Sequence, residues 1–459
     1  MTMMTLRRRS LAPLLTAALL AACAGTPTSP GKELPPVVFV HGNGDSAALW
    51  LTTQWRFESN GWPRERLHAV NFVYPQSRDD NTLAQEGRSS TDDQRAQLAA
   101  EVDKLLAATG AKQVVLYGNS RGGNAIRDYI ANGGGAAKVS HAILGGTPNH
   151  GVWAIPGFRP NNEFNGTGAF LTGLNLPKGP NGDEVTPGPK WMTIRSDNND
   201  KFAQPDGVWI GAKGTPTNVS YEGPALKGAN NVVLPGRDHR EVSYHPQAFA
   251  AAYRHITGSA PASTDVRAEP RVVLDGLVTG FTAGATNNLP LPGARMAVYA
   301  VDAATGQRKG AALVDKLVGA DGRWGPVNTD ARTALEFELG AAGFATTHFY
   351  RGAFARSSNI VHFKPERLAD ADKAAAAVLS FTRPRGYFGL PRDTILLDGQ
   401  PAPGIPPGVA GVAVSKLLLK DGAGRTLVGD YRSGEINERI AAIAWPAKDN
   451  HLTVLEINP

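Results

Sequence analysis

The pentapeptide at residues 118–122, Gly-Asn-Ser-Arg-Gly, constrains the fold of this chain more than any other feature. The run over residues 112–117 precedes it and predicts a buried strand. Ile126 and Ile130 follow it four residues apart, as one face of a helix requires. A serine where a strand turns sharply into a helix is held exposed above the sheet, and the flanking glycines permit close backbone approach. We therefore expect a nucleophile at Ser120.

Strand and helix patterns alternate around this pentapeptide. Residues 37–40 and 140–144 form short apolar runs that predict strands. Residues 91–109 carry apolar side chains at helical spacing, with Thr91 and Gln94 placed as a capping box. Such alternation predicts an α/β fold with a mostly parallel sheet flanked by helices.

A glycine loop, His-Gly-Asn-Gly, follows the first expected strand at residues 41–44. If Ser120 attacks an acyl carbon, the tetrahedral intermediate carries an oxyanion that two backbone N–H groups must stabilise. The usual donors are the residue after the nucleophile and one in the loop after an early strand. These are the amides of Arg121 and Asn43. The alternative for this loop is an ordinary strand-end turn.

A serine nucleophile also needs a base, and the base needs an acid that orients it. His239 lies directly after the strand expected at residues 231–235 and is the candidate base. His245 competes with it, but adjoins the proline that begins the next helix. Asp197 and Asp200 both follow another expected strand and compete for the role of the acid.

Several segments together resemble α/β-hydrolase lipases or esterases of the bacterial class 2 type, over about residues 34–258. They are HGNG (41–44), GNSRG (118–122), GTPNHG (146–151), SDNNDKFAQP (196–205) and GRDH (236–239). The resemblance implies the α/β-hydrolase fold and ester hydrolysis through an acyl-enzyme, with Ser120 as nucleophile and His239 as base. It also favours Asp200 as the acid, because KFAQP matches the loop that follows the acid in bacterial lipases. No cofactor is implied.

Arg121 departs from the smaller or apolar residues that often follow the nucleophile in this family. We expect its side chain to shape selectivity near the oxyanion hole.

The second half of the chain has a different pattern. Runs of period two, such as residues 294–301 and 335–339, predict an all-β sandwich or barrel. This half resembles the C-terminal β domain of archaeal-type long-chain lipases, which helps to bind or cover acyl chains. A passive spacer or a surface-attachment module is the alternative.

The N-terminal residues predict export. Three arginines precede an apolar stretch over residues 11–22 that is too short to span a bilayer. Cys23, the only cysteine of the chain, follows Leu-Ala-Ala and resembles the lipidated residue of bacterial lipoproteins. This implies a lipid anchor in the cell envelope, in the outer membrane or at the cell surface. A buried thiol is the alternative.

The patterns divide the chain into six parts. We expect a lipoprotein signal peptide (1–22), a flexible tether (23–33), an α/β-hydrolase catalytic domain (34–258), a linker (259–269), a β-sandwich-like domain (270–375) and a second β-rich unit (376–459).

Charge and composition limit the partners. The net charge of +6 is modest for 459 residues and gives no argument for nucleic-acid binding. No spaced ligand loop indicates a metal, and a single cysteine excludes internal disulfides. The sequence predicts a lipid-anchored serine hydrolase of fatty-acid esters. A polyester depolymerase is the alternative among enzymes, and a non-catalytic surface-binding lipoprotein is the alternative outside them.

Overall fold

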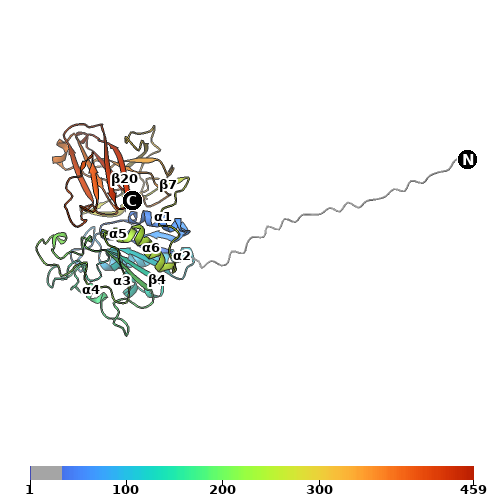
Figure 1. The fold of residues 1–459 in the computed structure, drawn as a ribbon, viewed down its shortest axis with the longest axis vertical. Coiled ribbons are helices and arrows are strands. Elements are labelled where there is room, and N and C mark those ends of the chain that lie inside the picture. Colours follow the sequence, from blue (N-terminus) through green and yellow to red (C-terminus); the bar gives the residue numbers. More distant parts are fainter. Residues whose placement is uncertain (2–33, 459) are drawn as a thin grey trace. The chain divides into compact units, whose positions relative to one another are not determined.

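The computed structural model describes Met1 and residues 34–458, and six parallel strands form the first sheet (Figure 1). The strand order is β2-β1-β3-β4-β5-β6. The bounds are β1 (Val37–Val40), β2 (Leu67–Ala69), β3 (Val114–Asn119), β4 (Val139–Gly145), β5 (Lys190–Arg195) and β6 (Asn230–Val233). The predicted parallel α/β fold of this half is confirmed.

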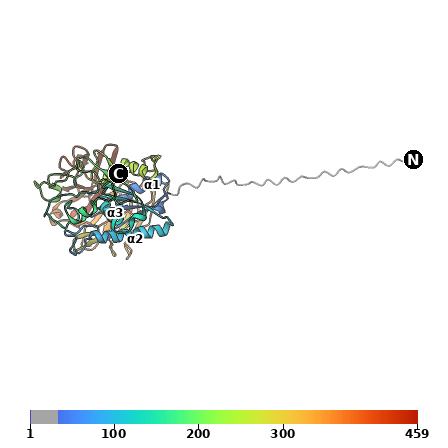
Figure 2. The same cartoon turned by 90° about the horizontal axis from the view of Figure 1, so that it is seen from below.

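Helices cover both faces of this sheet. Successive residues of a strand point to opposite faces, so both faces carry apolar side chains that pack against helices. They are α1 (Leu51–Ser59), α2 (Thr91–Thr109), α3 (Arg121–Asn132), α4 (Ala169–Leu174), α5 (Glu241–Tyr244) and α6 (Pro246–Thr257). Val38 and Leu116 pack in a buried cluster with residues of α2 and α3. On the other face, the ring of Phe39 contacts Phe57 of α1, which contacts Phe249 of α6. In Figure 2, α2 lies next to α3, on the side away from α1.

Helix α2 has the predicted bounds, but its capping box lies one residue earlier than expected. The Ser90 hydroxyl accepts a hydrogen bond from the Asp93 N–H, and the Asp93 carboxylate accepts one from the Ser90 N–H. A serine and an aspartate therefore satisfy each other's backbone N–H groups at the start of the helix.

The second half forms several sheets of mostly antiparallel strands, which confirms the predicted C-terminal all-β region. The bounds are β7 (Val272–Leu274), β8 (Thr279–Thr282), β9 (Ala285–Pro290), β10 (Arg295–Val301), β11 (Val314–Leu317), β12 (Val327–Thr329), β13 (Ala334–Gly340), β14 (Thr346–Arg351), β15 (Ala377–Thr382), β16 (Thr394–Leu397), β17 (Gln400–Pro401), β18 (Val414–Leu419), β19 (Thr426–Ser433), β20 (Ile436–Ile443) and β21 (His451–Glu456). The largest sheet has seven strands, in the order β11-β10-β13-β14-β21-β15-β18, and a second has four, β17-β16-β19-β20.

The seven-stranded sheet joins strands from both sides of residue 375. Strand β21 lies between β14 and β15 and is parallel to both. The predicted division at residue 375 therefore passes through one sheet, and the domain boundaries stay predictions.

The two halves share a buried core. Leu51 and Trp55 of α1 belong to one apolar cluster with Trp324 and Phe337 of the second half. The Trp55 indole also donates a hydrogen bond to the Ser357 carbonyl at 3.0 Å. These contacts fix α1 against the C-terminal sheets.

In the part of the chain that the structure describes, no helix combines the length and apolarity needed to cross a membrane. The predicted signal peptide, Cys23 and the tether lie outside the described residues.

Candidate active site

Ser120 lies on the sharp turn between β3 and α3. Its backbone has φ 52° and ψ −125°, a conformation that a residue with a side chain rarely adopts and that costs about 1–3 kcal/mol. The glycines around it are sterically required. A Cβ on Gly122 would lie 2.4 Å from the Val40 carbonyl oxygen, and one on Gly118 would lie 2.7 Å from Ile126 Cδ1. The sequence motif therefore produces the predicted sharp turn, although Ser120 itself is buried rather than exposed.

His239 and Asp200 meet next to this turn. His239 Nδ1 lies 2.9 Å from each carboxylate oxygen of Asp200. The Phe202 N–H donates to Asp200 Oδ1 at 2.8 Å, and the Phe202 ring packs edge-on against the imidazole, with centroids 4.6 Å apart. The carboxylate holds the proton on Nδ1, which leaves Nε2 as the free base. Within the described residues, Nε2 is buried without a hydrogen-bond partner.

Asp197, the competing acid, does not contact the histidine in this geometry. Its carboxylate accepts hydrogen bonds from Asn199 and from the Gly236 N–H. Burial opposes its ionisation, but these hydrogen bonds lower the pKa of Asp197 below its ordinary value. The residue therefore serves as a turn former.

His245, the competing base, caps α6. Its Nδ1 accepts the Gln247 N–H at 3.2 Å, and it does not line the cavity at Ser120. Burial, together with the nearby Arg237, lowers the pKa of His245 to about 3. This imidazole is neutral at ordinary pH.

The loop after β1 lies against the nucleophile. A Cβ on Gly42 would lie 3.0 Å from Ser120 Cβ. His41 is fully buried, donates from Nδ1 to the Gly42 carbonyl at 2.9 Å, and accepts the Phe72 N–H on Nε2. Burial lowers the pKa of His41 to about 4, so it is a neutral brace for the loop. Asn43 lines the cavity at Ser120, and its side chain accepts the Ser77 N–H at 2.8 Å.

Arg121 begins α3, where backbone N–H groups have no partner within the helix. Its amide therefore suits the predicted role as an oxyanion donor. The side chain, however, does not line the cavity. Its guanidinium is buried and donates to both oxygens of the Glu163 carboxylate. It also donates to the hydroxyl and the carbonyl of Ser89 and to the Pro75 carbonyl. A buried arginine requires such partners, and we therefore assign the side chain to holding loops together rather than to selectivity.

Asn119 is a positioning residue that the sequence reasoning missed. Its buried amide donates to the Gly145 carbonyl, the His239 carbonyl and the Ser243 hydroxyl. It therefore links the nucleophile turn to the loop of the base. The available signal was a polar residue directly before Ser120, at the end of an apolar strand.

Two cavities meet at His239 and Phe202. A cavity of about 310 Å³ contains Ser120 and is lined by the aromatic side chains Trp153, Phe164, Phe202, Trp209 and Tyr387. A larger one, of about 580 Å³, reaches Asp200 and His239 and includes apolar residues such as Leu226. Tyr387 belongs to the second half of the chain, which therefore supplies part of the wall beside the nucleophile.

One cluster among the described residues has the geometry of a metal site: Glu336, Glu338 and His348. Arg308 already pairs with both carboxylates, at 2.7 and 2.6 Å. His348 Nε2 is also occupied, by the ring of His451 at 2.7 Å. A guanidinium fills the place of a cation, and we assign no metal to the cluster.

Two lipase family models match successive parts of the chain. The class 2 lipase model matches residues 34–163, which include the loop after β1 and the Ser120 turn. The lipase C-terminal domain model matches residues 270–368. The chain is therefore similar to class 2 lipases over residues 34–163 and to lipase C-terminal domains over residues 270–368. This confirms the predicted family resemblance and supports an ester hydrolase with a lipid or ester substrate.

Solved structures similar to the chain include lipases and esterases. Mature Bacillus licheniformis lipase BlEst2 shares 20% identity over 50% of this chain and 95% of that chain, with a TM-score of 0.35. Its propeptide form shares 14% over 90% and 94%, with a TM-score of 0.34. Bacillus subtilis carboxylesterase CesB shares 13% over 50% and 85%, with a TM-score of 0.26. The fold of the first half is assigned from its own strand order rather than from these likenesses.

Proposed function

We propose that this chain is a serine carboxylic-ester hydrolase that cleaves fatty-acid esters through an acyl-enzyme. One observation carries the proposal. His239 contacts Asp200 through Nδ1, keeps Nε2 without a partner among the described residues, and lines the same cavity as Ser120. These are the parts that general-base activation of a serine requires.

In acylation, Ser120 Oγ attacks the ester carbonyl and gives its proton to His239 Nε2. Asp200 stabilises the resulting imidazolium. The carbonyl oxygen becomes an oxyanion, which accepts hydrogen bonds from the Asn43 and Arg121 amides; removing one such donor typically costs about 10²–10³ in rate. When the tetrahedral intermediate collapses, the alcohol leaves with the proton from His239.

In deacylation, water attacks the acyl-enzyme and His239 takes the water's proton. The second tetrahedral intermediate breaks the bond to Ser120 Oγ, which recovers its proton from His239. The fatty acid is released.

The lining of the two cavities supports an ester with a bulky apolar part. Aromatic rings line the Ser120 cavity beside charged side chains such as Arg88 and Arg159, and a second cavity extends beyond His239. An acyl chain and an alcohol group can therefore extend in two directions from the reacting carbonyl.

Residues 1–33 add a proposal about location. We propose that the chain is exported and anchored to the bacterial cell envelope through a lipid on Cys23. Metabolic labelling with a fatty-acid analogue should mark the chain but not its Cys23→Ala variant. Equal labelling of both would rule out the anchor.

The test of activity uses p-nitrophenyl esters from two to eighteen carbons with the chain beginning at residue 24, beside Ser120→Ala. We expect a long-chain optimum that disappears in the variant. A short-chain optimum with release of acid from a solid polyester would favour a polyester depolymerase instead. Activity that survives Ser120→Ala would exclude Ser120 as the nucleophile.

A further inference from the structure

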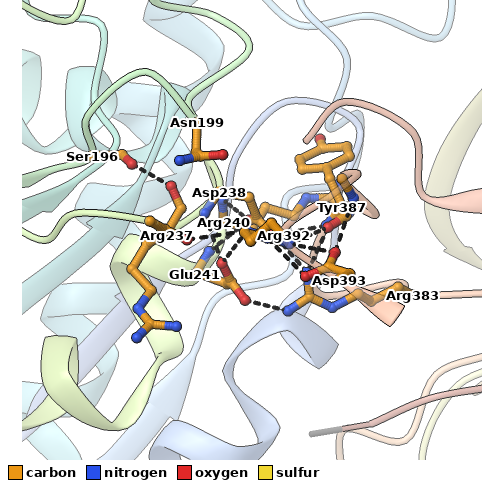
Figure 3. Close-up of polar contacts among 12 residues, drawn as sticks. Ser196, Asn199, Arg237, Asp238, Arg240, Glu241, Arg383, Tyr387, Arg392 and Asp393 are labelled. Atoms are coloured by element: carbon orange, nitrogen blue, oxygen red, sulfur yellow. Dashed lines mark hydrogen bonds and ion pairs between the residues drawn. The ribbon is translucent and has the colours of Figure 1, made fainter. Parts of the chain in front are cut away.

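Arg383 of the second half binds the two carboxylates that flank the candidate base. Its Nη1 donates to Asp238 Oδ2 at 2.7 Å, and its Nη2 donates to Glu241 Oε1 at 2.5 Å (Figure 3). The side chains of all three residues are completely buried. His239 lies between the two acidic residues in the sequence, and one guanidinium therefore clamps its loop on both sides.

Arg392 reinforces the clamp. Its Nη1 donates to Glu241 Oε2 at 2.8 Å, and its Nη2 to the Tyr387 carbonyl at 2.8 Å. The Tyr387 N–H in turn donates to Asp238 Oδ2. Burial opposes ionisation of Glu241, but the two guanidinium groups outweigh it and lower the pKa of Glu241 to about 2. Glu241 is therefore ionised at neutral pH, whereas burial and the neighbouring Glu241 carboxylate raise the pKa of Asp238 above its ordinary value.

The clamped carboxylates also set the shape of the loop. Asp238 Oδ1 accepts the N–H groups of Arg240 and Glu241, and Glu241 Oε2 accepts the Asp238 N–H. Arg240 extends this link by donating to the Pro384 carbonyl at 2.6 Å and pairing with Asp45 of the loop after β1 at 3.3 Å. The backbone on both sides of His239 is thus fixed by groups that the second half holds.

The loop of the acid docks on the same part of the second half. Lys201, directly after Asp200, donates to the Gly411 carbonyl at 2.9 Å and lies 3.9 Å from the centre of the Tyr387 ring. Trp209 packs so closely on Gly411 that a Cβ there would lie 1.9 Å from the indole. One segment, residues 383–411, therefore contacts the loops of both His239 and Asp200.

We propose that Arg383 and Arg392 are positioning residues that hold His239 in line with Asp200 and Ser120, so that the C-terminal half sets the turnover of the hydrolase site. This rests on the proposed function. It predicts that loosening the clamp lowers the turnover of each folded active site, and leaves substrate binding nearly unchanged.

The test compares Arg383→Lys and Arg392→Lys with the unchanged chain. Lysine keeps the positive charge but cannot bridge two carboxylates with fixed geometry. Arg425→Lys is the matched control, because Arg425 pairs with Asp398 on the exposed surface of the same half. Active sites are counted by incubation with a fluorophosphonate to completion, and kcat and KM are then measured with a p-nitrophenyl ester. We expect kcat per counted site to fall about tenfold to a hundredfold, with KM within about twofold, and no change in the control.

Each outcome decides the matter. If activity falls only because fewer sites can be counted, with normal kcat per site, the arginines merely stabilise the fold and the inference is overturned. If Arg383→Lys does not fold, the 15% exposed Arg392 gives the milder variant that decides. If the unchanged chain does not react with the fluorophosphonate, the proposed function fails, whatever the variants do.

Discussion

Ser120 and His239 line the same cavity but are held by different parts of the molecule. The Ser120 turn is fixed by β3, α3 and nearby glycines, all within the first half. The loop of His239 is held not only by Asn119 of the first half but also by Arg383, about 145 positions further along the chain. The geometry of the nucleophile therefore belongs to the parallel sheet, whereas that of the base depends on the contact between the two halves.

The largest expected effect is a loss of turnover, and it comes from a change at Asp200, which orients the base. Asp200→Asn keeps the shape of the loop but offers an N–H to His239 Nδ1, which favours the wrong tautomer. We expect kcat to fall about 10⁴-fold with little change in KM, measured by steady-state ester hydrolysis.

Asp197→Asn is the matched control for Asp200→Asn. Among the described residues, its carboxylate accepts hydrogen bonds only from Ser196, Asn199 and the Gly236 N–H, so we expect less than about a tenfold loss. Equal losses in the two variants would contradict the assignment of the acid.

A smaller effect, on the free energy of unfolding, is expected from a change at the nucleophile turn. Gly122→Ala places a methyl group against the Val40 carbonyl oxygen and should lower the free energy of unfolding by about 3 kcal/mol, measured in urea. Gly173→Ala in α4 is the control, because a Cβ there has no neighbour within 4 Å and the change should be at most about 1 kcal/mol. A fully stable Gly122→Ala variant would show that the turn tolerates a side chain.

The smallest effect concerns the loop beside the nucleophile and depends on pH. The folded state lowers the pKa of His41 from 6.5 to about 4 because the ring is buried. The unfolded chain therefore binds a proton below pH 6.5 that the folded chain takes up only near pH 4. The stability from neutral His41 is full above pH 6.5 and is lost as the pH falls towards 4, by about 2 kcal/mol at pH 5.

Urea unfolding at pH 7.5 and pH 5 measures this change. In His41→Gln the fall between the two values should shrink by about 2 kcal/mol. The remaining fall includes His245 and His362, whose pKa values are each lowered to about 3 by burial. An identical fall in both proteins would mean that His41 takes up its proton without cost.

The features that the sequence predicts well are those with local causes. Residues 112–122 contain a strand, a turn and two glycines in one stretch, and the strained backbone of Ser120 follows from their order. The misplaced capping box shows the limit of such patterns, because Ser90 and Thr91 both suit the start of a helix. The Asp200–His239 pairing needed the family resemblance, since either Asp197 or Asp200 satisfies the chain order.

The features that sequence reasoning missed have distant causes. No sequence pattern around Arg383 predicts that it pairs with Asp238 and Glu241. Its burial follows only from the docking of the two halves. Arg121 was expected at the cavity because of its place in the motif. The carboxylate that draws it away, Glu163, lies 42 positions further along the chain.

The position of β21 has a consequence for how the molecule is synthesised. This strand emerges from the ribosome after all the other described strands, yet it occupies an inner place between β14 and β15. Until it arrives, the strands on either side have open edges that invite pairing with other chains. The six-stranded parallel sheet can form early in translation, but the seven-stranded sheet is completed in one late step. Chains that stall before residue 451 should therefore carry a formed nucleophile turn and aggregate through these edges.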